Sequence, residues 1–241
     1  MPELGIRALT FDVFGTVVDW RNSIAREISI WGPRKGLDID GFAFADAWRG
    51  LYQPAMEKVR QEQMGWVNLD VLHRMNLDLL ADEFGLNVLD ETDLDHLNRV
   101  WHRLDPWPDV VAGMERLKQK FTLASLSNGN VALIVNMAKR GRIPWDMVLG
   151  AEVAGYYKPQ REAYSISVNL LGLDPNQALM VAAHNGDLVA AADVGLRTAF
   201  VRRPTEYGPN QNLDLEPKHK FDFIADNFLD LADQLGRSEE R

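Results

Sequence analysis

The chain has 241 residues, of which 46% are hydrophobic and 25% are charged, and these values exclude collagen-like, low-complexity and intrinsically disordered proteins. It contains no cysteine, which excludes disulfides, thiolate metal sites, iron–sulfur clusters and a cysteine nucleophile. The formal net charge of −9 argues against binding to nucleic acid or to an anionic membrane, because both favour a basic surface. An anionic substrate must therefore be attracted by local positive charge.

Residues 1–7 carry no basic segment followed by an apolar one, so we expect no signal peptide. No apolar run in the sequence approaches the roughly 20 residues that a membrane-spanning helix needs. We therefore expect a soluble protein of the cytoplasm.

Short apolar runs alternate with helical patterns over most of the chain. Five runs have the length and composition of strands: Ile6–Phe11, Thr122–Leu126, Met147–Leu149, Ala178–Ala183 and Thr198–Val201. Four segments between them carry apolar residues at helical spacing: Val110–Lys120, Val131–Arg140, Arg161–Leu171 and Leu188–Val194. This order predicts βαβ units, and hence an α/β fold with a doubly wound, Rossmann-like parallel sheet covered by helices on both faces.

Residues 20–106 interrupt the alternation, because they are almost entirely helical in pattern. The expected helices are Ser23–Ile30, Gly41–Arg60, Asn68–Glu83 and Asp93–Leu104. An insertion directly after the first strand lies over the carboxyl ends of the strands, where open α/β sheets bind ligands. We therefore predict a core domain of residues 1–19 and 107–241 and a helical cap domain of residues 20–106, with Pro106-Trp107-Pro108 as the hinge.

Polar residues follow the first two strands of the chain at the points where these strands end. Asp12 follows the first strand, where it can serve either as a functional carboxylate or as a turn residue that bonds its own backbone. Ser127, Asn128 and Gly129 follow the second strand and precede a helix. Such a turn can bind an anion with its free N–H groups, or it can simply cap the helix.

Two later segments place basic and acidic groups at the same end of the predicted sheet, where the strands have their carboxyl ends. Lys158 stands before Pro159 at the start of a helical segment, where a lysine is usually a solvated turn residue. His184 and Asp187 follow the fourth strand, and a lone histidine there is more often structural than catalytic. Arg202 and the residue after it, by contrast, are expected to lie in a solvated loop.

Together the four segments resemble the motifs of the haloacid dehalogenase superfamily, in the same order and over essentially the whole chain. The matching residues are Asp12-x-Phe14-Gly15-Thr16, Ser127-Asn128-Gly129, Lys158-Pro159 and the segment around Asp187. The resemblance implies the Rossmann-like core with an inserted cap. The set is highly specific, whereas the Ser-Asn-Gly motif by itself is weak.

Most members of that superfamily are Mg²⁺-dependent phosphatases with two aspartates in the first motif and two in the last. Here Phe14 stands at the second aspartate of the first motif, and Ala183 at the first aspartate of the last. A phenyl ring and a methyl group provide none of the oxygen ligands that Mg²⁺ requires. Phe14 also cannot protonate a leaving alkoxide. We therefore expect no metal site and no organic cofactor.

The branch without these carboxylates is that of the L-2-haloacid dehalogenases, which are hydrolases acting on carbon–halide bonds. Trp48 and Arg49 resemble the Trp-Arg pair with which that branch holds the departing halide, although an exposed helix arginine is the simpler reading. Trp66 resembles an aromatic residue of the pocket, in a looser match. The resemblance implies a small anionic substrate, a short 2-haloalkanoic acid, and it also suggests a homodimer.

The resemblance further implies a two-step mechanism. Asp12 attacks the substrate carbon from behind while the halide leaves, so the configuration inverts, and water then hydrolyses the aspartyl ester. Lys158 and the Ser127-Asn128 turn keep the nucleophile ionised and hold the substrate carboxylate. Arg49 and Asn128 stabilise the halide.

The remaining predicted site residues exclude water from the first step, bind the substrate or take part in hydrolysis of the ester. Phe14 and Trp66 exclude water while the halide leaves, and Thr16, the last residue of the first motif, is expected among the substrate-binding residues. Asp187 acts on the hydrolytic water, and His184 assists that water or donates to the leaving group. Fluoroacetate is then a possible substrate, because His184 and Arg49 could both donate hydrogen bonds to fluoride.

Three other functions remain open at this stage. The first is a phosphatase that recruits its metal through Asp12, Asp187 and Asp193. The second is a hydrolase that opens another C–X bond with the same aspartate nucleophile. The third is a non-catalytic binding protein, which would not require a nucleophile, a lysine and a hydrolytic acid together.

Overall fold

The computed structural model describes residues 5–237, so residues 1–4 and 238–241 lie outside the described residues. Two predictions fall partly on these residues. One is the absence of a signal peptide over residues 1–7, and the other is the extent of the core domain at both of its ends. Within residues 5–237, no helix is both long and apolar enough to cross a membrane.

A six-stranded parallel sheet with the strand order β5-β4-β1-β6-β7-β8 forms the centre of the larger part of the molecule. Its strands are β1 (Ala8–Phe11), β4 (Thr122–Ser127), β5 (Met147–Gly150), β6 (Ala178–Ala182), β7 (Arg197–Val201) and β8 (Phe223–Ala225). The first five match the predicted strands, which confirms the α/β fold with a parallel sheet. The sequence pattern did not indicate β8, because its three residues are too short for an alternation to be visible.

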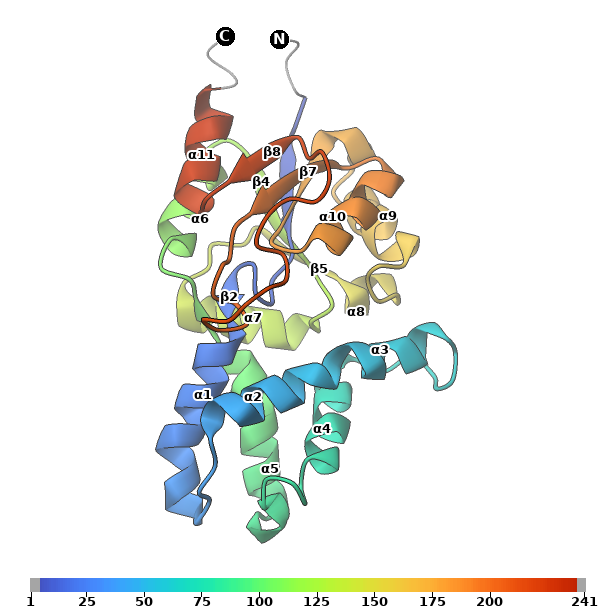
Figure 1. Ribbon diagram of the computed structural model, residues 1–241. Helices are drawn as coiled ribbons and strands as arrows, with labels where there is room; N and C mark the ends of the chain where they lie inside the picture. The colour runs from blue at the N-terminus through green and yellow to red at the C-terminus, as the bar shows by residue number, and fades with distance from the viewer. Residues whose placement is uncertain (1–4, 238–241) are drawn as a thin grey trace.

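Helices cover both faces of this sheet (Figure 1). They are α6 (Val110–Lys118), α7 (Val131–Gly141), α8 (Ala151–Ala154), α9 (Arg161–Leu170), α10 (Asn185–Val194) and α11 (Phe228–Arg237), with a short 3₁₀ turn η4 (Pro175–Gln177) before β6. Because side chains alternate along a strand, Leu9 and Phe11 pack with α6, α7 and α11, whereas Met180 and Ala182 pack with α9 and α10. The sheet is therefore buried on both faces, as a parallel sheet requires.

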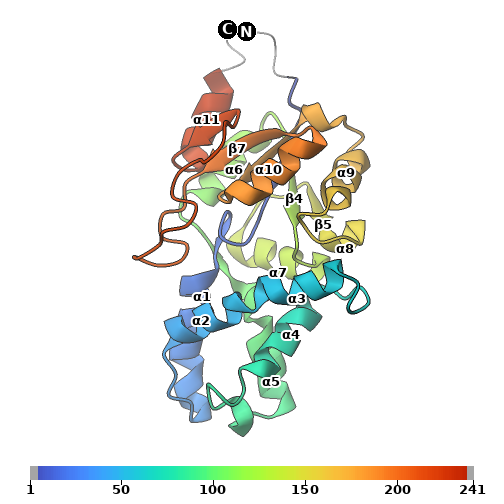
Figure 2. The same cartoon turned by 45° about the vertical axis from the view of Figure 1, so that its right-hand side comes forward.

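The helices between β2 (Val18–Asp19) and β3 (Asp105–Pro106) form a separate group at the end of the sheet opposite the start of β1 (Figures 1 and 2). They are α1 (Trp20–Trp31), α2 (Gly41–Gly50), α3 (Tyr52–Arg60), α4 (Leu69–Leu79) and α5 (Glu91–Asn98), with 3₁₀ turns η1 (Gly32–Lys35), η2 (Leu86–Val88) and η3 (Arg99–Arg103). Side-chain oxygens of Asp40 and Asn68 cap α2 and α4.

The predicted helix over residues 41–60 is wrong in one respect, because the chain forms two helices that meet at Leu51. Pro54 has no N–H group and cannot bond to the carbonyl of Gly50, so the regular ladder is interrupted there. The predicted helix over residues 93–104 likewise ends early and continues as the 3₁₀ turn η3.

The chain leaves the sheet and returns to it through two adjacent segments. β2 (Val18–Asp19) and β3 (Asp105–Pro106) pair in antiparallel fashion, with Val18 opposite Pro106. These segments flank the helical group at residues 20–103, so the chain enters and leaves this group through one short ladder. The carboxyl ends of the strands face that group.

The expectation that Arg203 lies in a solvated loop is wrong. Its side chain is only 6% exposed and donates two hydrogen bonds to the Asp109 carboxylate, at 2.8 and 2.9 Å, and a third to the carbonyl of Thr16. The guanidinium also lies against the rings of Trp107 and Phe228. Arg203 thus fastens the loop after β7 to the start of α6 and to the turn after β1.

Candidate active site

Asp12 directly follows β1 and is 7% exposed. Its N–H donates to the carbonyl of Val181 in β6, which fixes the backbone at the edge of the sheet. The hydroxyl of Thr16 donates to Asp12 Oδ2 at 2.7 Å and accepts the N–H of Ala183 at 2.9 Å. Thr16 therefore orients the Asp12 carboxylate and does not reach the cavity.

Lys158 joins two carboxylates. Its Nζ lies 2.9 Å from Asp12 Oδ1 and 2.5 Å from Asp187 Oδ2, and all three side chains are at most 10% exposed. The Lys158 N–H donates to Asn128 Oδ1 at 2.8 Å, so the Asn128 amide holds the lysine backbone in place. Ser127 lies one residue earlier, and its hydroxyl accepts the N–H of Gly129 within the turn.

His184 lies between Asp12 and a second acid that the sequence reading did not find. Its Nδ1 is 3.1 Å from Asp12 Oδ2, and its Nε2 is 2.8 Å from Glu206 Oε2. Glu206 comes from the loop after β7, is 1% exposed, and accepts the indole N–H of Trp20 at its other oxygen. Both nitrogens of His184 are engaged by carboxylates in this structure, so a donation from it to the leaving group stays a prediction.

Gly15 makes this approach of Glu206 possible. Its φ of +85° is a left-handed conformation that glycine favours, and an added Cβ would lie 2.0 Å from Glu206 Oε1. The glycine of the first motif is thus required both by the backbone and by the acid packed against it.

Asp187 is held by a second residue that the sequence reading missed. Tyr164 in α9 donates its hydroxyl to Asp187 Oδ1 at 2.5 Å, while Oδ2 accepts from Lys158. Tyr164 belongs to the apolar helix face that packs on the sheet, and its position at helical spacing gave no sign of this polar contact.

Burial and charge separate the two carboxylates of the site. Burial by itself would raise the pKa of Asp12, but the Lys158 ammonium and the His184 side chain hold it well below its ordinary value. For Asp187, burial dominates and the nearby Asp12 charge adds to it, so its pKa is raised in spite of Lys158. A low pKa suits a nucleophile, and a raised pKa suits a base.

The imidazole of His184 lies between two carboxylates, and these favour its charged form. Burial would lower its pKa, but the carboxylates of Glu206 and Asp12 on either side raise it well above the ordinary value for histidine. The pKa of Lys158 is likewise raised by Asp12 and Asp187 against the effect of burial.

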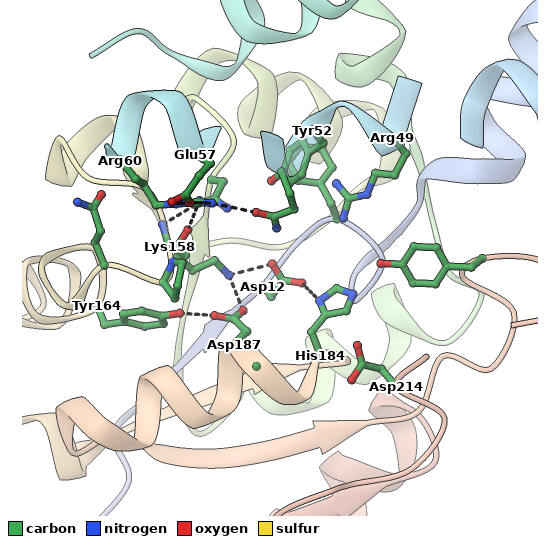
Figure 3. A pocket seen from close by; sticks show the side chains of 17 residues that line it. Asp12, Arg49, Tyr52, Glu57, Arg60, Lys158, Tyr164, His184, Asp187 and Asp214 are labelled. Carbon is green, nitrogen blue, oxygen red and sulfur yellow. Dashed lines mark hydrogen bonds and ion pairs between the residues drawn. The ribbon is translucent and has the colours of Figure 1, made fainter. Parts of the chain in front are cut away.

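These groups open into one cavity of about 710 Å³ between the sheet and the helices α2 and α3 (Figure 3). Its lining includes the predicted residues Asp12, Phe14, Arg49, Asn128, Lys158, His184 and Asp187, together with Tyr52, Gln53, Glu57, Arg60, Pro159, Gln160, Tyr164, Gly186, Tyr207 and Asp214. Seven of the ten predicted site residues therefore meet here.

Arg49 contributes a buried positive charge from the side of α2. Its guanidinium lies 4.1 Å from the centre of the Tyr52 ring and 5.4 Å from that of Trp20. Among residues 5–237, no hydrogen-bond partner is found for its buried Nη1. Arg49 also lines the cavity, and a buried donor left without a partner is suited to receive an anion.

Trp66 and Ser127 do not line the cavity. Trp66 is 41% exposed and stacks on Tyr157 with 6.2 Å between the ring centroids, so its assignment as a pocket residue is wrong. The Ser127 hydroxyl accepts the N–H of Gly129 in the turn after β4, which leaves its own proton unassigned, so its assignment to substrate binding stays a prediction. The loose match around residue 65 explains the error at Trp66.

The site does not suit Mg²⁺. Phe14 and Ala183, which stand where two carboxylates would be needed, are 2% and 1% exposed. Over the described range 5–237, no group of three or more His, Cys, Asp or Glu side chains is placed to hold a metal ion. Asp193, the third acid of the phosphatase alternative, lies towards the end of α10 and outside the cavity lining.

Comparisons with known proteins agree with this arrangement. A family model described as haloacid dehalogenase-like hydrolase matches residues 6–195. The chain is 27% identical to (S)-2-haloacid dehalogenase 4A of Burkholderia cepacia, over 84% of this chain and 87% of that protein. It is 24% identical to (S)-2-haloacid dehalogenase of Pseudomonas putida, over 97% and 98%.

Two solved structures are more similar still. The L-2-haloacid dehalogenase PA0810 is 47% identical, with a TM-score of 0.93 over 96% of this chain and 99% of that one. The defluorinating L-2-haloacid dehalogenase Rha0230 is 45% identical, with a TM-score of 0.94 over 96% and 95%.

Proposed function

The chain belongs to the haloacid dehalogenase-like hydrolases, in the branch of the L-2-haloacid dehalogenases, and from this we propose that it hydrolyses short 2-haloalkanoic acids to 2-hydroxy acids. One observation carries the proposal. Asp12, a buried and ionised carboxylate, shares a cavity with the unpartnered Nη1 of Arg49, and Phe14 replaces the second acid of a phosphatase.

In the first step, an oxygen of Asp12 attacks the substrate carbon, and the C–X electrons leave with the halide. Lys158 and His184 keep Asp12 ionised, so no proton has to be removed before attack. Arg49 stabilises the halide in a site where Phe14 and the ring of Tyr52 exclude water, which makes the charge more effective.

In the second step, water attacks the ester carbonyl of Asp12, and Asp187 takes up a proton from it. Tyr164 and Lys158 hold Asp187 in place for this role. The proton then passes from Asp187 to the departing oxygen of the 2-hydroxy acid, which leaves Asp12 as a carboxylic acid. The second proton of the water is then released to solvent, and Asp12 regains its carboxylate. The configuration of the substrate carbon inverts in the first step only.

The helical group acts as the cap of this site, and we assign residues 20–106 to a cap domain and residues 1–19 and 107–241 to the core. Cap-to-core hydrogen bonds support the assignment. Arg60 in α3 donates to the carbonyl of Lys158 at 2.9 Å, and the Tyr157 hydroxyl donates to the carbonyl of Val67 at 2.8 Å.

We extend the substrate range to fluoroacetate. The support is the 45% identity to a defluorinating relative and the free Nη1 of Arg49, because fluoride is a strong hydrogen-bond acceptor. Fluoride release from fluoroacetate and chloride release from chloroacetate, measured under the same conditions, test the extension to fluoroacetate alone. Chloride release without any fluoride release would remove fluoroacetate from the range and leave the rest in place.

The main test is halide release from 2-chloropropionate by the purified protein in the presence of EDTA, beside a panel of phosphate monoesters with Mg²⁺. We expect halide release that EDTA does not change and that Asp12→Asn abolishes. Phosphate release that depends on Mg²⁺, without halide release, would instead establish a phosphatase.

A cytoplasmic location and a homodimeric state are further proposals that rest on the family resemblance. Cell fractionation tests the first, and light scattering after size-exclusion chromatography tests the second. Recovery in a membrane or secreted fraction, or a single species of 27 kDa, would contradict them.

A further inference from the structure

The two oxygens of the Asp12 carboxylate have different surroundings. Oδ2 accepts from the hydroxyl of Thr16 at 2.7 Å and lies 3.1 Å from Nδ1 of His184. Oδ1 accepts from Lys158 Nζ at 2.9 Å, and within residues 5–237 no second donor to it is found. Since each carboxylate oxygen has about two lone-pair sites, Oδ2 is fully engaged and Oδ1 keeps one free.

This difference decides which oxygen attacks. The oxygen with a free lone pair, Oδ1, forms the bond to the substrate carbon. Oδ2 then becomes the carbonyl oxygen of the ester and remains in contact with Thr16 and His184. When water attacks the ester carbon, the electrons of the C=O bond move onto Oδ2, where these two donors meet the negative charge.

Thr16 and His184 are each fixed in the donating direction. The Thr16 oxygen already accepts the N–H of Ala183, so its own proton points to Asp12. His184 is held from behind by Glu206 Oε2 at 2.8 Å, and Glu206 in turn is fixed by the indole N–H of Trp20 at 3.1 Å. The buried Glu206 carboxylate at Nε2 raises the pKa of His184 and so favours the imidazole with a proton on both nitrogens.

We propose that Thr16 and His184 form the oxyanion-stabilising pair for hydrolysis of the Asp12 ester, and that Glu206 is the positioning residue that keeps His184 charged. The proposal rests on the haloacid hydrolysis proposed above and assigns a part of its second step. Glu206 touches neither the substrate nor the ester and acts through His184.

Glu206→Gln tests the charge while the hydrogen bonds stay. The amide oxygen of the new side chain can accept from Trp20, and its NH₂ group can donate to Nε2 of His184. The imidazole is then neutral with its proton on Nδ1, and it still donates to Asp12. Only the charge of the donor to Oδ2 is lost.

The measurement is rapid quench with 2-chloropropionate, which follows halide release and the decay of the Asp12 ester separately. In Glu206→Gln we expect halide release within about threefold of the wild type, and ester decay slowed about tenfold, because a charged donor is roughly twice as strong as a neutral one. The ester should accumulate as a mass increase on the peptide that contains Asp12.

The dependence of the ester decay rate on pH distinguishes the proposed role of Glu206 from a purely structural one, because loss of packing alone would not shift it. Ester decay should slow above the pH at which His184 loses its charge, and we expect this pH to be lower in Glu206→Gln. Asp12 carries no charge while it is esterified, so Glu206 is then the carboxylate that raises the pKa of His184. In His184→Asn, whose amide donor does not titrate, this alkaline fall should disappear. The other charged or titratable groups in the part of the cavity around the imidazole stay unchanged in both variants: Asp12, Arg49, Lys158, Asp187, Tyr207 and Asp214.

Glu216→Gln is the matched control, because it removes an exposed acid from the same connection between β7 and β8. Equal slowing of halide release and ester decay in Glu206→Gln would overturn the proposal, and so would an alkaline fall that persists in His184→Asn. If Glu206→Gln does not fold, the pH dependence of ester decay in His184→Asn tests the proposal by itself. A wild type that releases no halide would instead refute the proposed function itself.

Discussion

Lys158→Met removes the positive charge between two buried carboxylates. The Nζ of Lys158 lies 2.9 Å from Asp12 Oδ1 and 2.5 Å from Asp187 Oδ2, and the three side chains are 7%, 10% and 10% exposed. Little solvent is therefore available to screen the two acids when the ammonium is absent. Methionine fills most of the volume, so the change is mainly one of charge.

Two charge-assisted hydrogen bonds are lost, each worth about 1.5–3 kcal/mol, and breaking a buried ion pair from one side typically costs about 3–5 kcal/mol. We therefore expect the free energy of unfolding at pH 8 to fall by about 3–5 kcal/mol. This figure needs no reduction for exposure, because all three groups are buried.

The loss depends on pH in a definite direction. In the wild type the pKa of Lys158 is raised, so its contribution is complete below the ordinary lysine pKa and does not vary between pH 5 and 8. Without the ammonium, the pKa values of Asp12 and Asp187 rise, and the folded variant takes up a proton before the unfolded chain does. The deficit should therefore shrink as the pH falls from 8 to 5.

Urea unfolding of both proteins at pH 5, 6, 7 and 8 measures this effect, with exposed Lys218→Met as the control for loss of a lysine charge. A deficit below about 1 kcal/mol at pH 8 would match an exposed ion pair and refute the reasoning. A deficit of the same size at pH 5 and pH 8 would refute the assignment to the two carboxylates.

Three further substitutions test other parts of the site. Asp187→Asn should release halide once and then stop, with a mass increase on the peptide containing Asp12 that persists for many wild-type turnover times. Arg49→Met should slow halide release in the first turnover by about 10²-fold, the usual loss for one fixed charge-stabilising donor, while a change of less than threefold would argue against a halide site. Arg203→Lys should lower the free energy of unfolding by about 2 kcal/mol in urea titrations, because lysine cannot form both bonds to Asp109; an unchanged midpoint would contradict this.

The sequence predicted well the features that a local pattern of apolar and polar residues marks. Asp12, Lys158 and Asp187 each follow an apolar run or precede a helix, and the parallel order of the runs implies that their ends meet. The contacts of Arg49 could not be predicted in the same way, because they depend on where α2 lies relative to the sheet. Its assignment came from the resemblance, and the cavity now shows it beside Tyr52.

The residues that the sequence reading missed are joined over long sequence distances. Glu206 meets Trp20 across 186 positions, and Tyr164 meets Asp187 from a helix whose pattern records only its apolar face. Arg203 was expected in solvent because a pair of arginines after a strand has no local signal for burial. In each case tertiary packing, and not local preference, sets the environment.

The close approach of Gly15 and Glu206 links these two positions for protein engineering. A library that varies residue 15 alone meets two separate barriers, the left-handed backbone and the carboxylate 2.0 Å from the new Cβ. Shortening residue 206 removes the second barrier but also takes the counter-charge from His184. Any redesign of the turn after β1 must therefore change the loop after β7 at the same time. Directed evolution that changes one position at a time should recover few substitutions at residues 15 and 206.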